Sequence, residues 1–476
     1  MAFFNLLGEN EQQLKPAVCF NTDSLFDLMT GELKVGKGGK IYINGGMSPA
    51  VIGVMGRSNM YKSTFAASLM ARIAAIYGQQ VAIFDSEDSV GRGTDRLLRL
   101  AGNHMAELVP EQFLKFDATL DYDLATTEKK LKEFGEKKKT HQKELTFTTP
   151  FIDPTTGDLQ KVWAPTLVFI DSLTEMHSNE EDEMLDSKQG LADSKVKTVY
   201  MKDANNKTIF LRKIRRMAIE YGFIIVTTAH YGKQLNLDSY GPTPKQLQFM
   251  QQDYGPKGVG SKFLFLTSPQ FMVNSCKCLQ DDAKECWYKF GANTPKLDVN
   301  EIIIQIHRCK NASSGTMHPY VVSQENGLLT EVTDFNYLKQ MKWGLTGNNV
   351  TCQCMLTPDI NLTRNSLRPT CSEKPEEIRA LQLVAQYKYI LDHFNQDALL
   401  KTMGFNAAVT EKEFMDFLSS DKHKGLVDRM LHSRGYWLPK ELETKDTPEY
   451  LSIMDVLALY TKDLKGETHD GKHDSH

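Results

Sequence analysis

One segment, residues 51–77, constrains the fold of this chain more than any other part of the sequence. It reads VIGVMGRSNMYKSTFAASLMARIAAIY. Its apolar start predicts a strand, and residues 56–62 show no hydrophobic periodicity, as expected of a loop. Apolar residues then recur at the spacing of a helix, at Ala66, Leu69, Met70, Ile73 and Ala74. The segment therefore predicts a strand, a loop and a helix in immediate succession.

The predicted loop has the side chains that a phosphate-binding loop requires. Backbone N–H groups at the start of a helix attract an anion, the Lys62 ammonium would neutralise phosphate oxygens, and the Ser63 hydroxyl would reach a magnesium ion. We therefore expect a nucleotide site, with a plain strand-to-helix turn as the alternative. The residues expected to contact the nucleotide are Gly56, Arg57, Ser58, Asn59, Met60, Tyr61, Lys62, Ser63 and Thr64.

Tyr61 departs from the usual pattern of such a loop. In the pattern G-x-x-x-x-G-K-[ST] the residue before the lysine is glycine, and here it is tyrosine. A bulky residue at a position that needs positive φ costs about 1–2 kcal/mol. The sequence therefore leaves two alternatives, an ordinary φ at Tyr61 or a strained loop.

Composition limits the class of protein. The chain has 476 residues, of which 41% are hydrophobic and 24% charged, as is ordinary for a globular protein of two or three domains. A net charge of -4 excludes a globally basic nucleic-acid binder but leaves room for a local basic groove. No apolar run approaches the roughly 20 residues of a membrane helix, and no signal pattern opens the chain, so we expect no membrane partner. Eight cysteines in so long a chain favour a reducing intracellular compartment.

Three further apolar runs, at 81–84, 167–170 and 223–226, predict buried strands that end in polar residues. Glu87 follows the first run. Asp171 follows the second and His230 the third. The carboxyl ends of parallel strands share the sheet edge where ligands bind, so we expect these side chains near the 56–62 loop. The candidate roles are a general base for Glu87, with a helix-capping acid as the alternative, and support of the magnesium water shell for Asp171.

The order of these motifs resembles that of one family. The motifs GRSNMYKST, FDSE, LVFIDSL and IIVTTAH are similar to the ATPase core of the RecA family of strand-exchange recombinases. The resemblance spans residues 25–329 and is greatest to the UvsX group of bacterial viruses, in which an aromatic residue likewise replaces the second glycine. It implies that Lys62 and Ser63 bind the phosphates and Mg²⁺ of ATP. It also implies that Glu87 activates the attacking water and that Asp171 supports the metal.

The same resemblance gives roles to His230 and to two cations. It implies that His230 senses the γ-phosphate and passes the signal to a DNA-binding loop. Many family members have glutamine there, whereas the viral group shares the histidine. It further implies that Arg308 and Lys310 reach the ATP of the next subunit and make hydrolysis depend on assembly. Cations at a strand end with no partner are the alternative for this pair.

Two long segments resemble the DNA-binding loops of the family. They span residues 178–206 and 231–262, and loops of this length inside a compact domain are usually functional or disordered. Lysines there would meet backbone phosphates, and Tyr240 and Tyr254 would insert between bases. Ordinary solvation is the alternative for each lysine. The lysines that we expect to contact DNA are Lys195, Lys197, Lys202, Lys233, Lys245 and Lys257.

The sequence predicts an α/β protein with four parts. A RecA-like P-loop ATPase core, residues 49–333, has a mainly parallel twisted sheet flanked by helices, and a short helical segment before it, residues 1–48, serves oligomerisation. A mostly helical C-terminal domain follows at 334–465, and the tail 466–476 is expected to be disordered. A charged helix and a hairpin in 123–165 form a surface excursion from the core. Its lysine run is expected to be a solvated face, with contact to nucleic acid as the alternative.

Six of the cysteines fall into two groups. Free thiols are expected, because C-x-C is not the usual zinc-binding spacing, and a structural zinc site is the alternative. The groups are Cys276, Cys278 and Cys286, and Cys352, Cys354 and Cys371.

The hypothesis that follows is an ATP-dependent DNA recombinase. It would use ATP and Mg²⁺, form filaments on single-stranded DNA, pair that DNA with homologous duplex DNA and exchange strands in recombination and repair. Hydrolysis would be DNA-dependent and would occur at subunit interfaces. Expected partners include a single-strand-binding protein and a recombination mediator, and the expected location is DNA in the cytoplasm of a bacterium infected by a bacteriophage. The alternatives are a hexameric helicase or ring motor with the same core, and a non-hydrolysing single-stranded-DNA-binding mediator.

Overall fold

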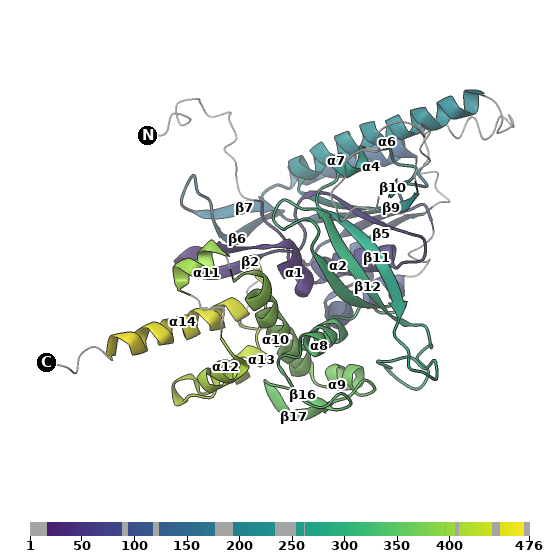
Figure 1. The fold of residues 1–476 in the computed structure, drawn as a ribbon. Coiled ribbons are helices and arrows are strands. Elements are labelled where there is room, and N and C mark those ends of the chain that lie inside the picture. The colour runs from purple at the N-terminus through teal and green to yellow at the C-terminus, as the bar shows by residue number, and fades with distance from the viewer. Residues whose placement is uncertain are drawn as a thin grey trace, which may run out of the picture.

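The centre of the molecule is a ten-stranded sheet, seen in the computed structural model of the chain (Figure 1). The structure describes residues 17–87, 94–117, 123–176, 194–233, 254–260, 262–395, 397–404, 409–439 and 448–470. Within these residues the strand order is β14-β13-β12-β11-β3-β9-β8-β4-β5, and β10 pairs with β9. The strands are β3 (Ala50–Gly56), β4 (Val81–Asp85), β5 (Phe113–Asp117), β8 (Thr166–Asp171), β9 (Phe223–Lys233), β10 (Tyr254–Pro256), β11 (Gln270–Cys278), β12 (Val299–Arg308), β13 (Met317–Ser323) and β14 (Gly327–Leu328).

The middle of this sheet is parallel. The strands β11, β3, β9, β8, β4 and β5 run in the same direction, whereas β10, β12, β13 and β14 pair antiparallel. β8 and the first part of β9 are nearly continuous apolar runs, as expected of strands whose two faces are both covered. The prediction of an α/β protein with a mainly parallel sheet and flanking helices is confirmed.

Helices cover both faces of the sheet. On one face, α2 (Lys62–Tyr77) packs in a hydrophobic core with Ile52 and Val54 of β3. On the other face, α4 (Leu124–Thr140) and α6 (Ser194–Tyr221) form a second core with Met55 of β3. Alternate residues of a strand point to opposite faces, so β3 contributes to both cores. The loop that joins β3 to α2 is therefore anchored to a strand that is buried on both sides.

The region 123–165 contains the predicted helix and hairpin. After α4 come β6 (Thr146–Ile152) and β7 (Leu159–Trp163), which pair antiparallel. α4 lies beside α6, to which an ion pair of 2.9 Å joins it, between Glu128 and Lys213 (Figure 1). The helix of this region is thus one of those that cover the sheet.

Before β3, the described residues from 17 onward include a helix and a hairpin. Ser24 caps the helix by accepting a hydrogen bond from the backbone N–H of Phe26. The elements are α1 (Leu25–Thr30), β1 (Glu32–Val35), η2 (Lys37–Gly39) and β2 (Ile41–Asn44), and β1 pairs antiparallel with β2. Short elements also lie between the strands of the sheet, namely α3 (Thr94–Arg99), η3 (Gly102–Glu107), η4 (Pro110–Gln112) and α7 (Phe263–Leu266).

Helices predominate after the sheet, around α10 (Pro375–His393). Thr410 and Glu413 form a capping box at the start of the helix that begins at Glu411. The predicted boundary at 334 falls inside α8, and α14 extends into the predicted tail, of which 471–476 lie outside the described residues. The other elements are α8 (Thr330–Met341), β15 (Leu345–Gly347), β16 (Cys352–Cys354), β17 (Thr357–Leu362), α9 (Leu367–Glu373), α11 (Ala398–Met403), α12 (Glu411–Leu418), η6 (Asp421–His423), α13 (Leu426–Leu431) and α14 (Ile453–Asp470).

Two general features accompany this architecture. All eight cysteines are free thiols. Every helix among the described residues is too short or too polar to span a bilayer.

Lys138 is an exception within the lysine run of α4. Its side chain is buried, and its Nζ atom donates hydrogen bonds to the Ala164 carbonyl at 2.5 Å and to the Thr166 hydroxyl at 2.9 Å. Burial lowers the pKa of this ammonium to about 7. The prediction of a solvated lysine face is therefore wrong for Lys138, because α4 directs this side chain onto the start of β8.

We predict that Lys138 makes the stability of the protein rise with pH. Lysine in an unfolded chain has a pKa of about 10.4, whereas burial lowers the pKa of Lys138 to about 7. Between these pH values the unfolded state binds more protons than the folded state, so the free energy of unfolding increases as pH rises. Lys138→Met cannot titrate and should lose this increase. Urea denaturation at about pH 6 and about pH 9 measures the difference.

The matched control for this prediction is Lys132→Met, because Lys132 is an exposed lysine on the same helix. Lys138 lines a cavity together with three other titratable residues, Glu111, Lys137 and His141. These three are present in the wild type and in both variants, so their contribution to the pH dependence of stability cancels in the comparison. Equal pH dependence of stability in the wild type and Lys138→Met would contradict the prediction.

Candidate functional site

The 56–62 loop lies at the edge where the parallel strands end. β3 ends at Gly56 and α2 begins at Lys62. A Cβ atom on Gly56 would come within 3.1 Å of Lys62 Cδ, so glycine leaves room for the lysine side chain. The Lys62 Nζ donates a hydrogen bond to the Arg57 carbonyl at 2.9 Å, across the loop. Burial lowers the pKa of the Lys62 ammonium, and the carboxylates of Glu87 and Asp171 oppose that shift.

Tyr61 has a left-handed backbone conformation, with φ 59° and ψ 23°. Asn59 also has a φ of 59°. Of the two alternatives that the sequence left open, the structure therefore has the strained loop. Contacts of the ring offset part of the cost of about 1–2 kcal/mol. The Tyr61 hydroxyl accepts a hydrogen bond from Asn300 Nδ2 at 2.9 Å, and the half-buried ring packs against the core.

Asp171 connects the start of α2 to two strands. Its carboxylate, at the end of β8, is 1% exposed and accepts hydrogen bonds from the Ser63 hydroxyl at 3.0 Å and from the Thr228 hydroxyl of β9. Hydroxyl and carboxylate oxygens are the ligands that Mg²⁺ prefers. The donor set at Ser63 and Asp171 therefore fits the predicted magnesium ion.

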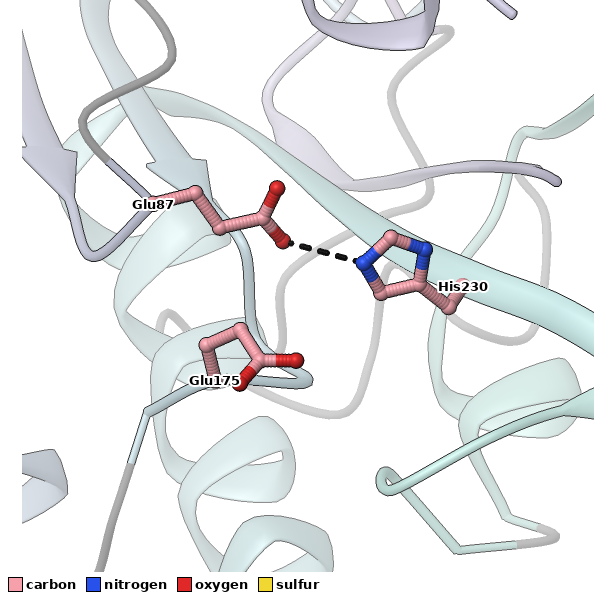
Figure 2. Close-up of side chains that lie close together, drawn as sticks. All are labelled: Glu87, Glu175 and His230. Atoms are coloured by element: carbon pink, nitrogen blue, oxygen red, sulfur yellow. Dashed lines mark ion pairs between the residues drawn. The ribbon is translucent and has the colours of Figure 1, made fainter. Parts of the chain in front are cut away.

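Glu87 and His230 face one another beside the loop (Figure 2). The Oε1 atom of Glu87 lies 3.2 Å from Nε2 of His230, and Glu87 also accepts a hydrogen bond from the Ser172 hydroxyl. The other ring nitrogen of His230, Nδ1, lies 3.4 Å from the Ser58 hydroxyl of the 56–62 loop. The candidate base and the candidate sensor are thus in direct contact, and the sensor reaches the loop.

Glu175, which was not predicted, completes this group (Figure 2). The ligand atoms of Glu87, Glu175 and His230 all lie within 4.8 Å of one another. Carboxylate oxygens and imidazole nitrogens are common ligands of divalent cations, so the group is also a possible donor set for a metal. A signal for Glu175 exists in the sequence, because in FIDSLTE an acid stands four residues beyond Asp171.

A hollow of 470 Å³ adjoins this group. Arg57 and Ser58 of the loop line one part of it and His230 another. Lys233, at the end of β9, and Lys257, just after β10, also line it, and both are exposed. The acid Glu175 and the rings of Tyr231 and Tyr254 belong to the same lining. The loop, the candidate sensor and two lysines predicted to bind DNA therefore share one surface.

The other lysines predicted to contact DNA lie away from this hollow or cannot be placed. Lys202 is exposed on α6. Lys195 and Lys197 belong to the first residues of α6, and their side chains lie outside the described part of the chain, as does the whole of Lys245. Contact between these lysines and DNA stays a prediction.

Arg308 and Lys310 lie at the edge of the sheet opposite Lys62. β12 runs antiparallel to β11, and Arg308, at its end, pairs with Gln270, at the start of β11. Lys310 lines a cavity together with Ala50, the first residue of β3. One protomer therefore does not bring these two cations to its own 56–62 loop.

Comparisons with known proteins leave the family of this chain open. No family model matches the chain, and no curated protein matches it. Among solved structures, the crystal structure of the RadB recombinase is similar with a TM-score of 0.32 and 13% sequence identity, over 60% of this chain and 92% of that chain. A similarity this low carries no argument about function, so the candidate site rests on the geometry described above.

We predict that position 61 tolerates glycine better than alanine. Both substitutions remove the tyrosine ring and its hydrogen bond with Asn300. The difference in stability between the two variants therefore reports the cost of the backbone conformation at this position. Tyr61→Gly should be more stable than Tyr61→Ala by about 1 kcal/mol in urea denaturation, because only glycine adopts positive φ freely. The same two substitutions at Lys132, inside α4, are the control, and there alanine should be favoured. Alanine favoured at both positions would contradict the left-handed conformation of Tyr61.

Proposed function

We propose that this protein is an ATP-dependent DNA recombinase of the RecA type. It polymerises on single-stranded DNA, pairs that DNA with homologous duplex DNA and exchanges strands in recombination and repair. The main support is that five predicted side chains meet at one edge of a mainly parallel sheet. These are Lys62, Ser63, Glu87, Asp171 and His230.

ATP binds to the 56–62 loop. The loop amides and the N-terminus of α2 favour the negative phosphates. The Lys62 ammonium now donates to a neutral carbonyl, that of Arg57, and a phosphate oxygen is a stronger, charged acceptor. Mg²⁺ held by Ser63 and Asp171 neutralises phosphate charge when it is bound.

Glu87 accepts a proton from the attacking water. Its side chain is partly exposed, so water reaches the carboxylate, and contacts with Ser172 and His230 orient it. A γ-phosphate in the loop changes the surroundings of Ser58, which lies against the ring of His230. His230 is part of β9, so a change at its ring is passed toward Lys233 at the end of that strand.

Single-stranded DNA binds beside the 470 Å³ hollow. The exposed ammonium groups of Lys233 and Lys257 meet backbone phosphates. The ring of Tyr254 provides a stacking surface for a base, and the Arg57 guanidinium lies 5.5 Å from the centre of this ring. Since Arg57 belongs to the ATP-binding loop, nucleotide and DNA act on adjoining groups.

Subunits assemble head to tail. Arg308 and Lys310 lie opposite the ATP-binding edge, so they reach ATP only on a neighbouring subunit. A repeated contact between two different faces produces an open helical filament when the rotation does not close a ring. Hydrolysis then depends on assembly, and assembly depends on DNA. A single-strand-binding protein and a mediator are the partners proposed for loading.

Lys62→Ala and Glu87→Gln should each abolish DNA-stimulated ATP hydrolysis. Lys62→Ala removes the cation at the phosphates, whereas Glu87→Gln removes the base and leaves the binding loop intact. Phosphate release should fall by about 100-fold or more in both variants. Binding of a fluorescent ATP analogue should be lost in Lys62→Ala alone.

The control for these variants is Lys132→Ala, on the exposed face of α4. Undiminished DNA-stimulated hydrolysis in Glu87→Gln would contradict the role of Glu87.

Electron microscopy with single-stranded DNA and a slowly hydrolysed ATP analogue tests assembly, and filaments are expected. Rings or monomers alone under these conditions would contradict the recombinase and favour a ring motor.

Mixing two inactive variants should restore hydrolysis if ATP lies between subunits. Lys62→Ala has a defective ATP-binding loop but keeps both cations at the opposite edge of the sheet. The double variant Arg308→Ala, Lys310→Ala lacks those cations but keeps a normal loop. In filaments of an equal mixture, about a quarter of the interfaces combine a normal loop with normal cations, so about a quarter of wild-type activity should return. Lys62→Ala mixed with Glu87→Gln is the control and should stay inactive. Failure of the first mixture to recover activity would contradict catalysis in trans.

A further inference from the structure

A separate cavity of 570 Å³ lies on the side of the sheet away from the 56–62 loop. It is lined by the first residues of four parallel strands, Val81 of β4, Phe113 of β5, Thr166 of β8 and Phe223 of β9. The end of α4 covers it. Because the candidate nucleotide site lies where these strands end, this cavity is distinct from it.

Lys138 of α4 places a buried positive charge at this cavity. The residue is 6% exposed, and its Nζ donates to the Ala164 carbonyl at 2.5 Å and to the Thr166 hydroxyl at 2.9 Å. Both acceptors are neutral, and an ammonium has three N–H donors. The rings of Trp163 and Phe223, whose centres lie 5.6 and 5.5 Å from Nζ, add a weak attraction. Within the described part of the chain, no carboxylate is paired with this lysine.

A buried ammonium without a counter-charge is unfavourable, as the pKa of about 7 also indicates. An anion in the cavity would supply the missing charge and accept the remaining N–H of Lys138. The rim favours an anion too, because Lys137 and His141 are exposed there. Among the described lining residues, Glu111 is the one acid.

Part of the cavity wall is apolar, beside the three glutamines Gln79, Gln80 and Gln112. Phe134 and Leu145 line it together with the strand residues already named. Leu114 of β5 is 50% exposed although it faces this cavity, so an apolar surface is left for a ligand to cover. A buried cation beside an uncovered apolar wall is complementary to a molecule with an acidic group on an apolar body.

We propose that this cavity binds a small organic anion, with its carboxylate or phosphate group on Lys138 and its apolar body against Leu114 and Phe134. The volume agrees with small-molecule sites, which measure about 300–1,000 Å³. The proposal does not depend on the recombinase assignment, so either can fail without the other.

Isothermal titration calorimetry of the full chain with hexanoate tests this proposal. All titrations use a Lys62→Ala background, so that the 56–62 loop does not contribute anion binding. Hexanoate combines the acidic group with an apolar body, acetate lacks the body, and hexylamine reverses the charge. Saturable binding of hexanoate is expected, with acetate weaker by about 10-fold or more and no binding of hexylamine. Phenyl phosphate in place of hexanoate shows which acidic group is preferred.

Two variants locate the binding site within the chain. Lys138→Met should weaken hexanoate binding by about 10-fold or more, because a charge-assisted hydrogen bond is lost. Leu114→Trp fills the cavity from a half-exposed position and leaves Lys138 unchanged. It should weaken hexanoate binding by about as much as Lys138→Met does. The control Lys132→Met should bind as tightly as the background chain.

Two results would overturn the proposal. One is the absence of hexanoate and phenyl phosphate binding at millimolar concentration, which would leave Lys138 with a structural role alone. The other is unchanged affinity in Leu114→Trp, which would place the bound anion elsewhere. If Lys138→Met does not fold, the hexanoate affinity of Leu114→Trp alone tests whether the anion binds in this cavity.

Discussion

The hydrogen bonds accepted by Asp171 fix the geometry on which the candidate site depends. The carboxylate is buried at the end of β8 and receives the hydroxyl of Ser63 from α2 and that of Thr228 from β9. A buried carboxylate without such donors would be costly, so the three elements are held together by the need to satisfy one charge. The start of α2, and with it Lys62, is thereby fixed relative to the strand ends that carry the other site residues.

The same helix is fixed at a second point by Arg72. This residue is 1% exposed, and its guanidinium donates to the carbonyls of Thr22 and Asp23 at 2.6 and 2.9 Å. The Asp23 carboxylate in turn accepts a hydrogen bond from Gln382 of α10 at 2.6 Å. One rigid helix therefore joins the 56–62 loop to the N-terminal segment and to the helices that follow the sheet. A shift of the whole helix would strain bonds in those regions, because Ser63 at its start and Arg72 in its second half are both bonded to buried groups.

Apolar runs in the sequence predict the strands, and with them the edge of the sheet at which the site residues lie. Glu87 and His230 each follow an apolar run of the sequence, and they are expected on one edge because parallel strands share their direction. The structure has them in contact, although β9 continues past His230 to Lys233. The sequence leaves the conformation of Tyr61 open, because the ring is held by a hydrogen bond from Asn300, 239 residues away in the sequence. The burial of Lys138 was missed for the same reason. The run of lysines in α4 indicates a solvated face. Lys138 is buried through a contact with the Ala164 carbonyl, which follows the β6–β7 hairpin and is not apparent from the local sequence.

Lys62 and Lys138 represent the same physical situation at opposite edges of one sheet. They are 7% and 6% exposed, and each donates to a backbone carbonyl, at 2.9 and 2.5 Å. A carbonyl satisfies a donor without neutralising its charge, so an anion is the stronger partner for either ammonium. Glu87 and Asp171 partly compensate the charge of Lys62, whereas burial alone acts on the pKa of Lys138. Lys138 therefore lacks the nearby carboxylates that Lys62 has, and an anion that reached it would offset part of the cost of burying its ammonium.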